Sequence, residues 1–150
     1  MYSIGQVAEM FGLPISTLRY YDKQGLFPNM ERVSGIRKFS ETEIEALRVI
    51  ECLKKAGMSL KDIREYIHLA MEGDSTIEER LQLFYRQRKI LQAQMEELQH
   101  TMDVLDFKCW YYETARDAGT VQVPQSMSVE ELPPQFRNLK RDLAKVPIVD

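Results

Sequence analysis

The sequence has few of the residues that build metal sites, disulfide frameworks and enzyme active sites. Its 150 residues include two cysteines, two histidines and one tryptophan. Cys52 and Cys109 stand far apart, and neither lies in a CxxC or Cys/His cluster, so no disulfide framework or metal site is indicated. The chain also lacks a nucleophile–base pair, a phosphate loop and a paired-carboxylate motif. We therefore expect neither an enzyme nor a cofactor.

Long hydrophobic runs are absent as well. No apolar stretch approaches the roughly 18 residues that would span a bilayer, and no basic, apolar signal peptide opens the chain. With 44% hydrophobic and 29% charged residues, the composition is globular. We expect a cytoplasmic protein with no membrane partner, built as one ordinary domain or as a small domain plus an extended element.

The sequence also lacks an overall positive charge, since its net charge is −3. This value argues weakly against nucleic-acid binding, because phosphate contacts need cations. The average hides an asymmetry: residues 1–40 contain more basic than acidic side chains, and the acidic excess lies after residue 70. For such partners the charge distribution matters more than the total.

Two short helices are predicted at the start of the chain. Ser3 and Gln6 fit a capping box, and the residues that follow recur on one helical face: Ile4, Val7, Ala8 and Phe11. Gly12 suits the end of this helix, and Pro14 suits the first turn of the next. The spacing therefore predicts a helix-turn-helix.

The second of these helices has a polar outer face. At about 100° per residue, Ile15, Leu18 and Asp22 share its inner side. The outer side holds Ser16, Thr17, Tyr20, Lys23 and Gln24, with Arg19 and Tyr21 flanking the boundary. Hydroxyls, a cation and a polar-tipped ring suit phosphate oxygens and base edges in a major groove, so Ser16 and Tyr21 are among the predicted DNA-contact residues of this helix. The alternative is an ordinary solvated face.

A small hairpin is predicted after this helix. Pro28-Asn29 and Ser34-Gly35 are turn signals, and they bracket a short strand that ends at Val33. A second strand at 36–39 can pair back with it. The hairpin carries Arg32, Arg37 and Lys38. A helix-turn-helix with a basic hairpin is a winged helix, whose wing can reach the DNA backbone.

Two more helices complete the predicted DNA-binding domain, residues 1–72. Ser40 caps a helix that runs to Ala56, and Ser59 caps the next. Cys52 lies in the first of them, with Arg48 four residues before it and Lys55 three after. Because cationic neighbours favour the thiolate, Cys52 is a candidate sensor residue. The alternative is a small buried hydrophobe.

Residues 75–112 have the clearest periodicity in the chain. Spacings of four and three alternate through Ile77, Leu81, Phe84, Arg88, Leu91, Met95, Leu98, Met102, Leu105, Cys109 and Tyr112. This is the a/d seam of a coiled coil, on a helix of roughly 36 residues and about 54 Å. A second copy of the chain could cover the seam, so we expect a homodimer. The alternative is a helix folded back on its own domain.

The segment 113–150 is a tail with a possible effector role. Its four prolines limit it to short pieces, such as a helical turn near 136–143. Trp110, Tyr111 and Tyr112 precede it and form either a ligand pocket or a hydrophobic cover for the helix end.

Three stretches of the sequence resemble the MerR family of bacterial transcription regulators. They read "YSIGQVAEMFGLPISTLRYYDKQGLFP", "SGIRKFSETEIEAL" and "IECLKKAGMSLKDIREYI", and the joint occurrence of "TLRYYDKQGL" and "GIRKF" is the most specific part of the likeness. Two positions depart from the family pattern. Pro14 stands where a threonine or serine cap is common, and Phe39 stands where tyrosine often ends the wing.

The resemblance implies a mainly α fold, in which a winged helix-turn-helix precedes a long antiparallel coiled-coil dimerisation helix. It assigns DNA contact to Thr17, Arg19, Tyr20, Lys23, Gly35 and Arg37. It also implies a second wing, to which Lys55 belongs, and a dimer that distorts an overlong promoter spacer so that RNA polymerase can engage. The alternatives are a repressor or architectural protein with no thiol sensor, and an organic-ligand sensor.

The context "CLKKAG" around Cys52 resembles an aldehyde- and electrophile-responsive branch of the family, similar to NmlR and AdhR. The likeness implies a small electrophile as the effector. The end of the long helix lacks the paired cysteines of the metal-sensing members.

Overall fold

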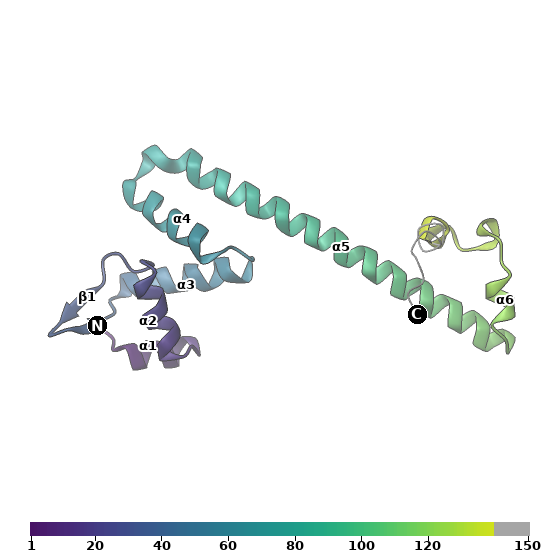
Figure 1. The fold of residues 1–150 in the computed structure, drawn as a ribbon, viewed down its shortest axis with the longest axis horizontal. Coiled ribbons are helices and arrows are strands. Elements are labelled where there is room, and N and C mark those ends of the chain that lie inside the picture. The colour runs from purple at the N-terminus through teal and green to yellow at the C-terminus, as the bar shows by residue number, and fades with distance from the viewer. Residues whose placement is uncertain (140–150) are drawn as a thin grey trace. The chain divides into compact units, whose positions relative to one another are not determined.

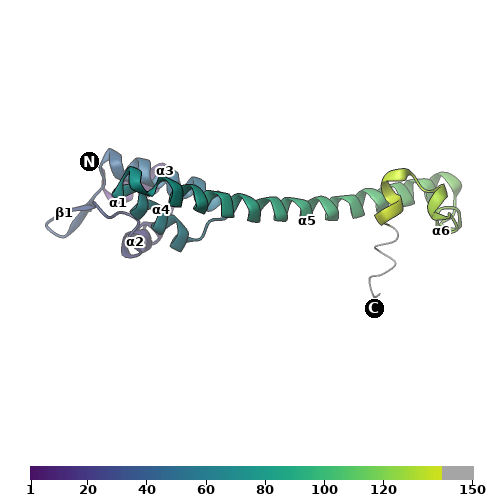
Figure 2. The same cartoon turned by 90° about the horizontal axis from the view of Figure 1, so that it is seen from above.

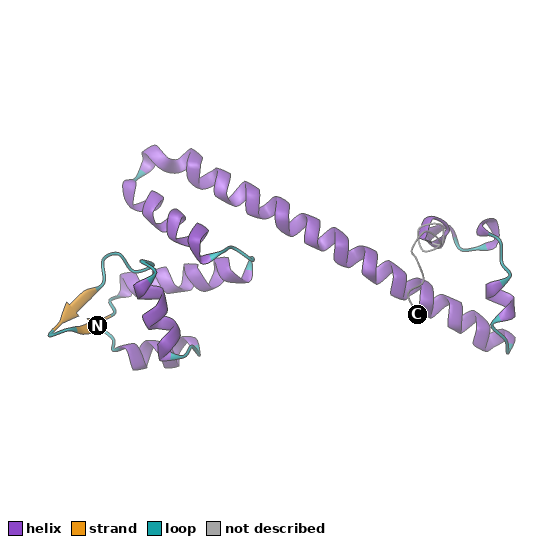
Figure 3. Ribbon diagram, in the orientation of Figure 1, coloured by secondary structure: helices purple, strands orange, loops and turns teal. Residues whose placement is uncertain are grey.

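The computed structural model describes residues 1–139. It is mainly helical, and in this part of the chain the strands form one two-stranded hairpin (Figure 3). The chain divides into two compact units, one comprising Met1–Leu91 and the other beginning at Gln92. Among the described residues, no helix has the length and apolar character needed to cross a bilayer.

The chain opens with the predicted pair of short helices, α1 (Ile4–Phe11) and α2 (Ile15–Lys23). The Ser3 hydroxyl accepts a hydrogen bond from the Gln6 backbone N–H at 3.2 Å, and the Gln6 side chain accepts one from the Ser3 N–H at 2.8 Å. This reciprocal pair is the predicted capping box. Gly12 ends α1 with a φ of 63°, a left-handed conformation that glycine adopts without steric cost.

The wing consists of strands β1 (Glu31–Val33) and β2 (Ile36–Lys38), which pair antiparallel (Figure 1). Ser34 and Gly35 join them with φ values of 52° and 77°. Two consecutive positive φ values make the tight turn whose twist matches a hairpin. Phe39 then pairs with Tyr2 through backbone hydrogen bonds of 2.7 and 2.9 Å. The hairpin is thereby fixed to the start of the chain.

Helices α3 (Glu41–Lys55) and α4 (Leu60–Glu72) complete the first unit, with Ser40 and Ser59 as their caps. Apolar residues from all four helices and from the segments between them meet in one core. Its fully buried members include Val7, Leu18, Tyr21, Leu26, Phe39, Leu47, Ile50 and Ile63. This core holds α2 against α3 and leaves the opposite face of α2 in solvent.

After a short 3-10 turn (Asp74–Thr76), helix α5 runs over Ile77–Ala118, and Figure 2 draws it as one uninterrupted helix. It extends beyond the predicted end at residue 112. Phe84, which the heptad pattern assigns to the dimer seam, also has a contact within its own unit. Its ring packs edge-on against Tyr66 of α4 at 5.0 Å, and it lies against the core of its own unit.

In the second unit, the last turns of α5 and part of the tail form an aromatic cluster. Phe107, Phe136 and Leu139 are buried together, with Trp110 and Tyr111 packed against them. The tail that supplies Phe136 contains α6 (Gln122–Gln125) and two 3-10 turns, Val129–Glu131 and Pro134–Phe136. Helical backbone therefore begins before the predicted turn at 136–143, and the end of that turn lies outside the described residues.

Candidate nucleic-acid interface

Helix α2 exposes most of the polar face that its sequence predicts. Ser16, Arg19, Tyr20 and Lys23 are exposed, and Thr17 is half-buried. Within the described residues, neither Arg19 nor Lys23 forms an ion pair. Their charges are therefore available to an anionic partner such as a phosphate backbone.

Tyr21 does not belong to this face, and its assignment to DNA contact is corrected. Its ring is 1% exposed and packs in the core. Its hydroxyl donates a hydrogen bond to Glu51 Oε1 at 2.9 Å and accepts one from Lys54 Nζ. At position 21 the helix has turned its side chain toward α3, so the residue positions α2 and cannot reach a groove.

The contacts of Tyr21 raise the pKa values of two groups, its own hydroxyl and the Lys54 ammonium. Burial raises the pKa of the Tyr21 hydroxyl, and the hydrogen bond to Glu51 adds to this effect, while the Lys54 ammonium opposes it. The hydrogen bond with Tyr21 raises the pKa of Lys54. Both groups therefore remain protonated at neutral pH, which keeps this link between α2 and α3 intact.

The wing is attached to α2 through Asp22. Arg37 Nε lies 2.6 Å from Asp22 Oδ2, and Arg32 lies 2.7 Å from the same oxygen. The two arginines face each other across the hairpin, where like charges would repel. Asp22, only 9% exposed, offsets that repulsion and attaches both wing arginines to α2.

Sequence reasoning missed this role of Asp22, although it placed the residue on the inner side of the helix. An acidic residue on a buried face needs a partner, and the wing arginines were the available cations. Of the other predicted wing positions, Gly35 is exposed at the turn and Lys38 is half-buried.

Helix α4 reaches the end of α2. An Arg64 side-chain nitrogen lies 3.5 Å from the Gln24 backbone oxygen, and the Arg64 and His68 side chains flank Gly25. Lys55, predicted for the second wing, is exposed at the end of α3. These cations lie on the same unit as the α2 face.

Cys52 is exposed on α3, so the alternative that it is a small buried hydrophobe is not supported. Arg48, one of its predicted cationic neighbours, forms an ion pair with Glu45. Lys55 forms no ion pair within residues 1–139. Neighbouring Glu51 faces Tyr21, which links the helical turn that carries the thiol to α2.

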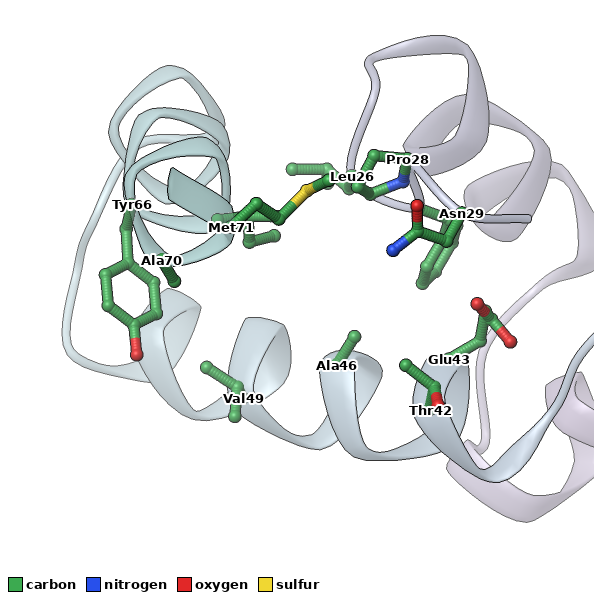
Figure 4. A pocket seen from close by; sticks show the side chains of 12 residues that line it. Leu26, Pro28, Asn29, Thr42, Glu43, Ala46, Val49, Tyr66, Ala70 and Met71 are labelled. Carbon is green, nitrogen blue, oxygen red and sulfur yellow. The ribbon is translucent and has the colours of Figure 1, made fainter. Parts of the chain in front are cut away.

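A cavity of about 280 Å³ lies between α3, α4 and the segment that follows α2 (Figure 4). Its walls are mainly apolar, with Ala46 and Val49 from α3 and Ala70 and Met71 from α4. Trp110 and Tyr111 do not line it. Those two rings pack against Phe107 and the tail, whereas Tyr112 is exposed.

The seam of α5 is the other surface of interest. Leu81, Leu91, Met95, Leu98, Met102 and Leu105 are all exposed large hydrophobic residues. Cys109 is exposed as well. Large apolar side chains aligned on one face of a helix mark an interaction surface.

Comparison with known proteins agrees with this arrangement. Residues 2–69 match the model of the MerR HTH family of regulatory proteins, and residues 44–106 match the model described as MerR, DNA binding. An uncharacterised HTH-type transcriptional regulator of Haemophilus influenzae is 40% identical over 131 residues, which are 87% of this chain and 97% of that protein.

Two further relatives bear on function. AdhR of Bacillus subtilis, an HTH-type transcriptional regulator, is 42% identical over 59% of this chain and 64% of its own. The crystal structure of HiNmlR, a MerR family regulator lacking the sensor domain and bound to promoter DNA, superimposes with a TM-score of 0.64. It is 41% identical and covers 81% of this chain and 98% of its own. The chain therefore belongs to the MerR family and is a transcriptional regulator.

Proposed function

We propose that this regulator binds promoter DNA with the exposed face of α2 and the wing fixed beside it. The observation that carries the proposal is the ion pair between Arg37 of the wing and Asp22 of α2, since α2 is the helix that exposes Arg19, Tyr20 and Lys23. A helix face with cations and hydroxyls fits a major groove, and an adjacent arginine fits the phosphates that border it. Promoter DNA bound to HiNmlR supports the same assignment.

The exposed seam of α5 supports a homodimer. Two copies related by a two-fold axis present two α2 helices, which matches a dyad-symmetric site with two half-sites. Binding of both half-sites at a spacing the relaxed duplex does not offer requires the DNA to bend and untwist, at a cost of about 1–6 kcal/mol. In this proposal, the distortion aligns the promoter elements for RNA polymerase and activates transcription.

Cys52 is the proposed sensor of a small electrophile. Its thiol is exposed on α3, and the neighbouring residue Glu51 is hydrogen-bonded to Tyr21 of α2. An adduct on the sulfur can shift this turn of α3, and the hydrogen bond carries the shift to the DNA-reading helix. A change in half-site geometry then alters the distortion energy.

DNA binding is tested by the affinity of Arg19→Ala for duplexes selected from a random pool by the wild-type protein. We expect weaker binding, and a logarithmic salt slope smaller in magnitude by about one, because one phosphate contact is lost. Lys89→Ala is the control, since it removes the same charge from an exposed position on α5 outside the seam. Wild-type affinity and salt slope in Arg19→Ala would contradict the proposed interface.

A further inference from the structure

The cavity of the first unit has an apolar body and one polar end (Figure 4). Ala46 and Val49 of α3 lie on one side of the body, and Leu26 and Met71 lie opposite them. The polar side chains gather at the end away from Tyr66, and they are Asn29, Thr42 and Glu43. The volume of about 280 Å³ is close to the lower limit for ligand sites, about 300 Å³. Apolar walls with a few convergent polar groups are typical of a small-molecule site.

Glu43 is the buried charge at this end, since only 6% of it is exposed. Its Oε2 accepts hydrogen bonds from the backbone N–H of Ser40, at 2.8 Å, and from the Ser40 hydroxyl. Among residues 1–139, Oε1 accepts no hydrogen bond and the carboxylate forms no ion pair. Because a buried anion is costly without a partner, Oε1 is an acceptor for a further cationic donor.

The helix cap accounts for only part of this carboxylate. Glu43 is the N3 residue of α3, where its side chain returns to the Ser40 N–H in a capping box. That role needs one oxygen, and glutamine fulfils it as well. The helix dipole also favours an acid in the first turn, but this effect does not involve Oε1 in a contact. A negative charge at the end of an apolar cavity therefore points to a ligand of opposite charge.

We propose that this cavity binds a small organic primary amine in its ammonium form. An alkylammonium has three N–H donors and no acceptor. The polar end has three acceptors, which are Glu43 Oε1, the Asn29 amide oxygen and the Thr42 hydroxyl. The apolar part of the amine then covers Val49 and Met71, which are 40% and 53% exposed. An anion would be repelled by Glu43, and a neutral alcohol would leave its charge uncompensated.

This site differs from the proposed thiol sensor in place and in chemistry. Cys52 does not line the cavity, and an ammonium is held there without a covalent bond. Residues 26–29, which join α2 to the wing, all contribute to the cavity wall. A bound amine therefore contacts the connection between the two parts of the proposed DNA interface.

The experiment titrates the full chain with 2-phenylethylammonium and with 2-phenylethanol, its neutral analogue. Isothermal titration calorimetry at neutral pH gives the two dissociation constants. We expect one amine to bind per chain, and the alcohol to bind about tenfold more weakly, because only the ammonium compensates the carboxylate.

Two kinds of variant locate the binding. Glu43→Gln keeps the capping acceptor and removes the charge, so we expect about tenfold weaker binding of the amine and unchanged binding of the alcohol. Ala46→Leu fills the cavity and should bind neither probe. Val49→Phe is a second filling variant, and circular dichroism establishes that each variant is folded. Ala93→Leu adds the same side chain as Ala46→Leu at an exposed position of α5 and should bind like the wild type.

The remaining outcomes overturn the proposal, each in a different way. Equal affinity for the two probes, or unchanged amine binding in Glu43→Gln, would show that the charge has no part in recognition. Wild-type binding in a folded filling variant, or its loss in Ala93→Leu, would place the amine elsewhere. No binding by the wild type would exclude the site. Binding by the seam variant Leu98→Asp alone would show that a second copy of the chain covers the cavity.

Discussion

The hydroxyl of Tyr21 on α2 is hydrogen-bonded to the carboxylate of Glu51 on α3 at 2.9 Å, beside Lys54 of the same helix. This contact connects α2 with α3, the helix that carries Cys52. Since the Tyr21 ring is buried, the contact contributes to stability and to the orientation of α2, and it is not part of the exposed face of that helix.

Tyr21→Phe is expected to lower the free energy of unfolding by about 1 kcal/mol, because the ring still packs while the hydrogen bonds to Glu51 and Lys54 are lost. Urea denaturation measures the change. Tyr20→Phe is the matched control: its ring is half-exposed, and we expect no change in stability. Equal destabilisation of the two variants would argue against the Tyr21 contact.

The same pair predicts a pH dependence of stability. The pKa values of Tyr21 and Lys54 are both raised in the folded protein, so folding favours their protonated forms. Their contribution is complete below the unfolded pKa values and is lost as the pH rises through the folded ones. Wild-type stability should therefore fall more steeply than that of Tyr21→Phe above about pH 10. Parallel curves would contradict this linkage.

Asp22→Asn tests whether the wing must be anchored. Removing a negative charge beside the DNA would by itself strengthen binding, whereas releasing Arg37 should weaken it. We expect the second effect to dominate, with an affinity loss of about tenfold. Gel shifts measure the affinity of each variant for DNA. Glu31→Gln is the control, because it removes a wing carboxylate that pairs with neither arginine. Tighter DNA binding by Asp22→Asn would show that the anchor is dispensable.

Leu98→Asp is expected to sediment as a monomer, because a dimer would bury an unpaired carboxylate in its seam. Ile90→Asp introduces the same charge at another exposed apolar position of α5, off the seam, and should remain dimeric. Dimers of Leu98→Asp at the wild-type dissociation constant would exclude the seam as the interface.

Cys52→Ser is expected to bind the selected duplexes with wild-type affinity and to lose induction by formaldehyde, since serine cannot form the thiol adduct. Transcription from a reporter promoter carrying the selected site measures induction. Cys109→Ser should retain both properties, because its thiol lies on α5 in the proposed dimer seam. Full induction in Cys52→Ser would end the thiol-sensor hypothesis.

The sequence alone determined the local elements of the first unit. The capping box at Ser3 and Gln6, the turn at Ser34-Gly35 and the caps at Ser40 and Ser59 all depend on residues a few positions apart. Such signals are readable because they act through local backbone geometry. The heptad spacing likewise predicted a long helix, although it did not give the end of that helix at Ala118.

Only the tertiary structure decided which side chains remain available for function. Tyr21 and Tyr20 are neighbours in sequence, yet α3 covers one and leaves the other in solvent. Phe84 fits the heptad pattern as well as Leu91 does, but its ring packs against Tyr66 of α4 within its own unit. Asp22 receives its role from arginines 10 and 15 residues away. Periodicity assigns a residue to a face of its own helix, whereas packing between elements determines what that face contacts.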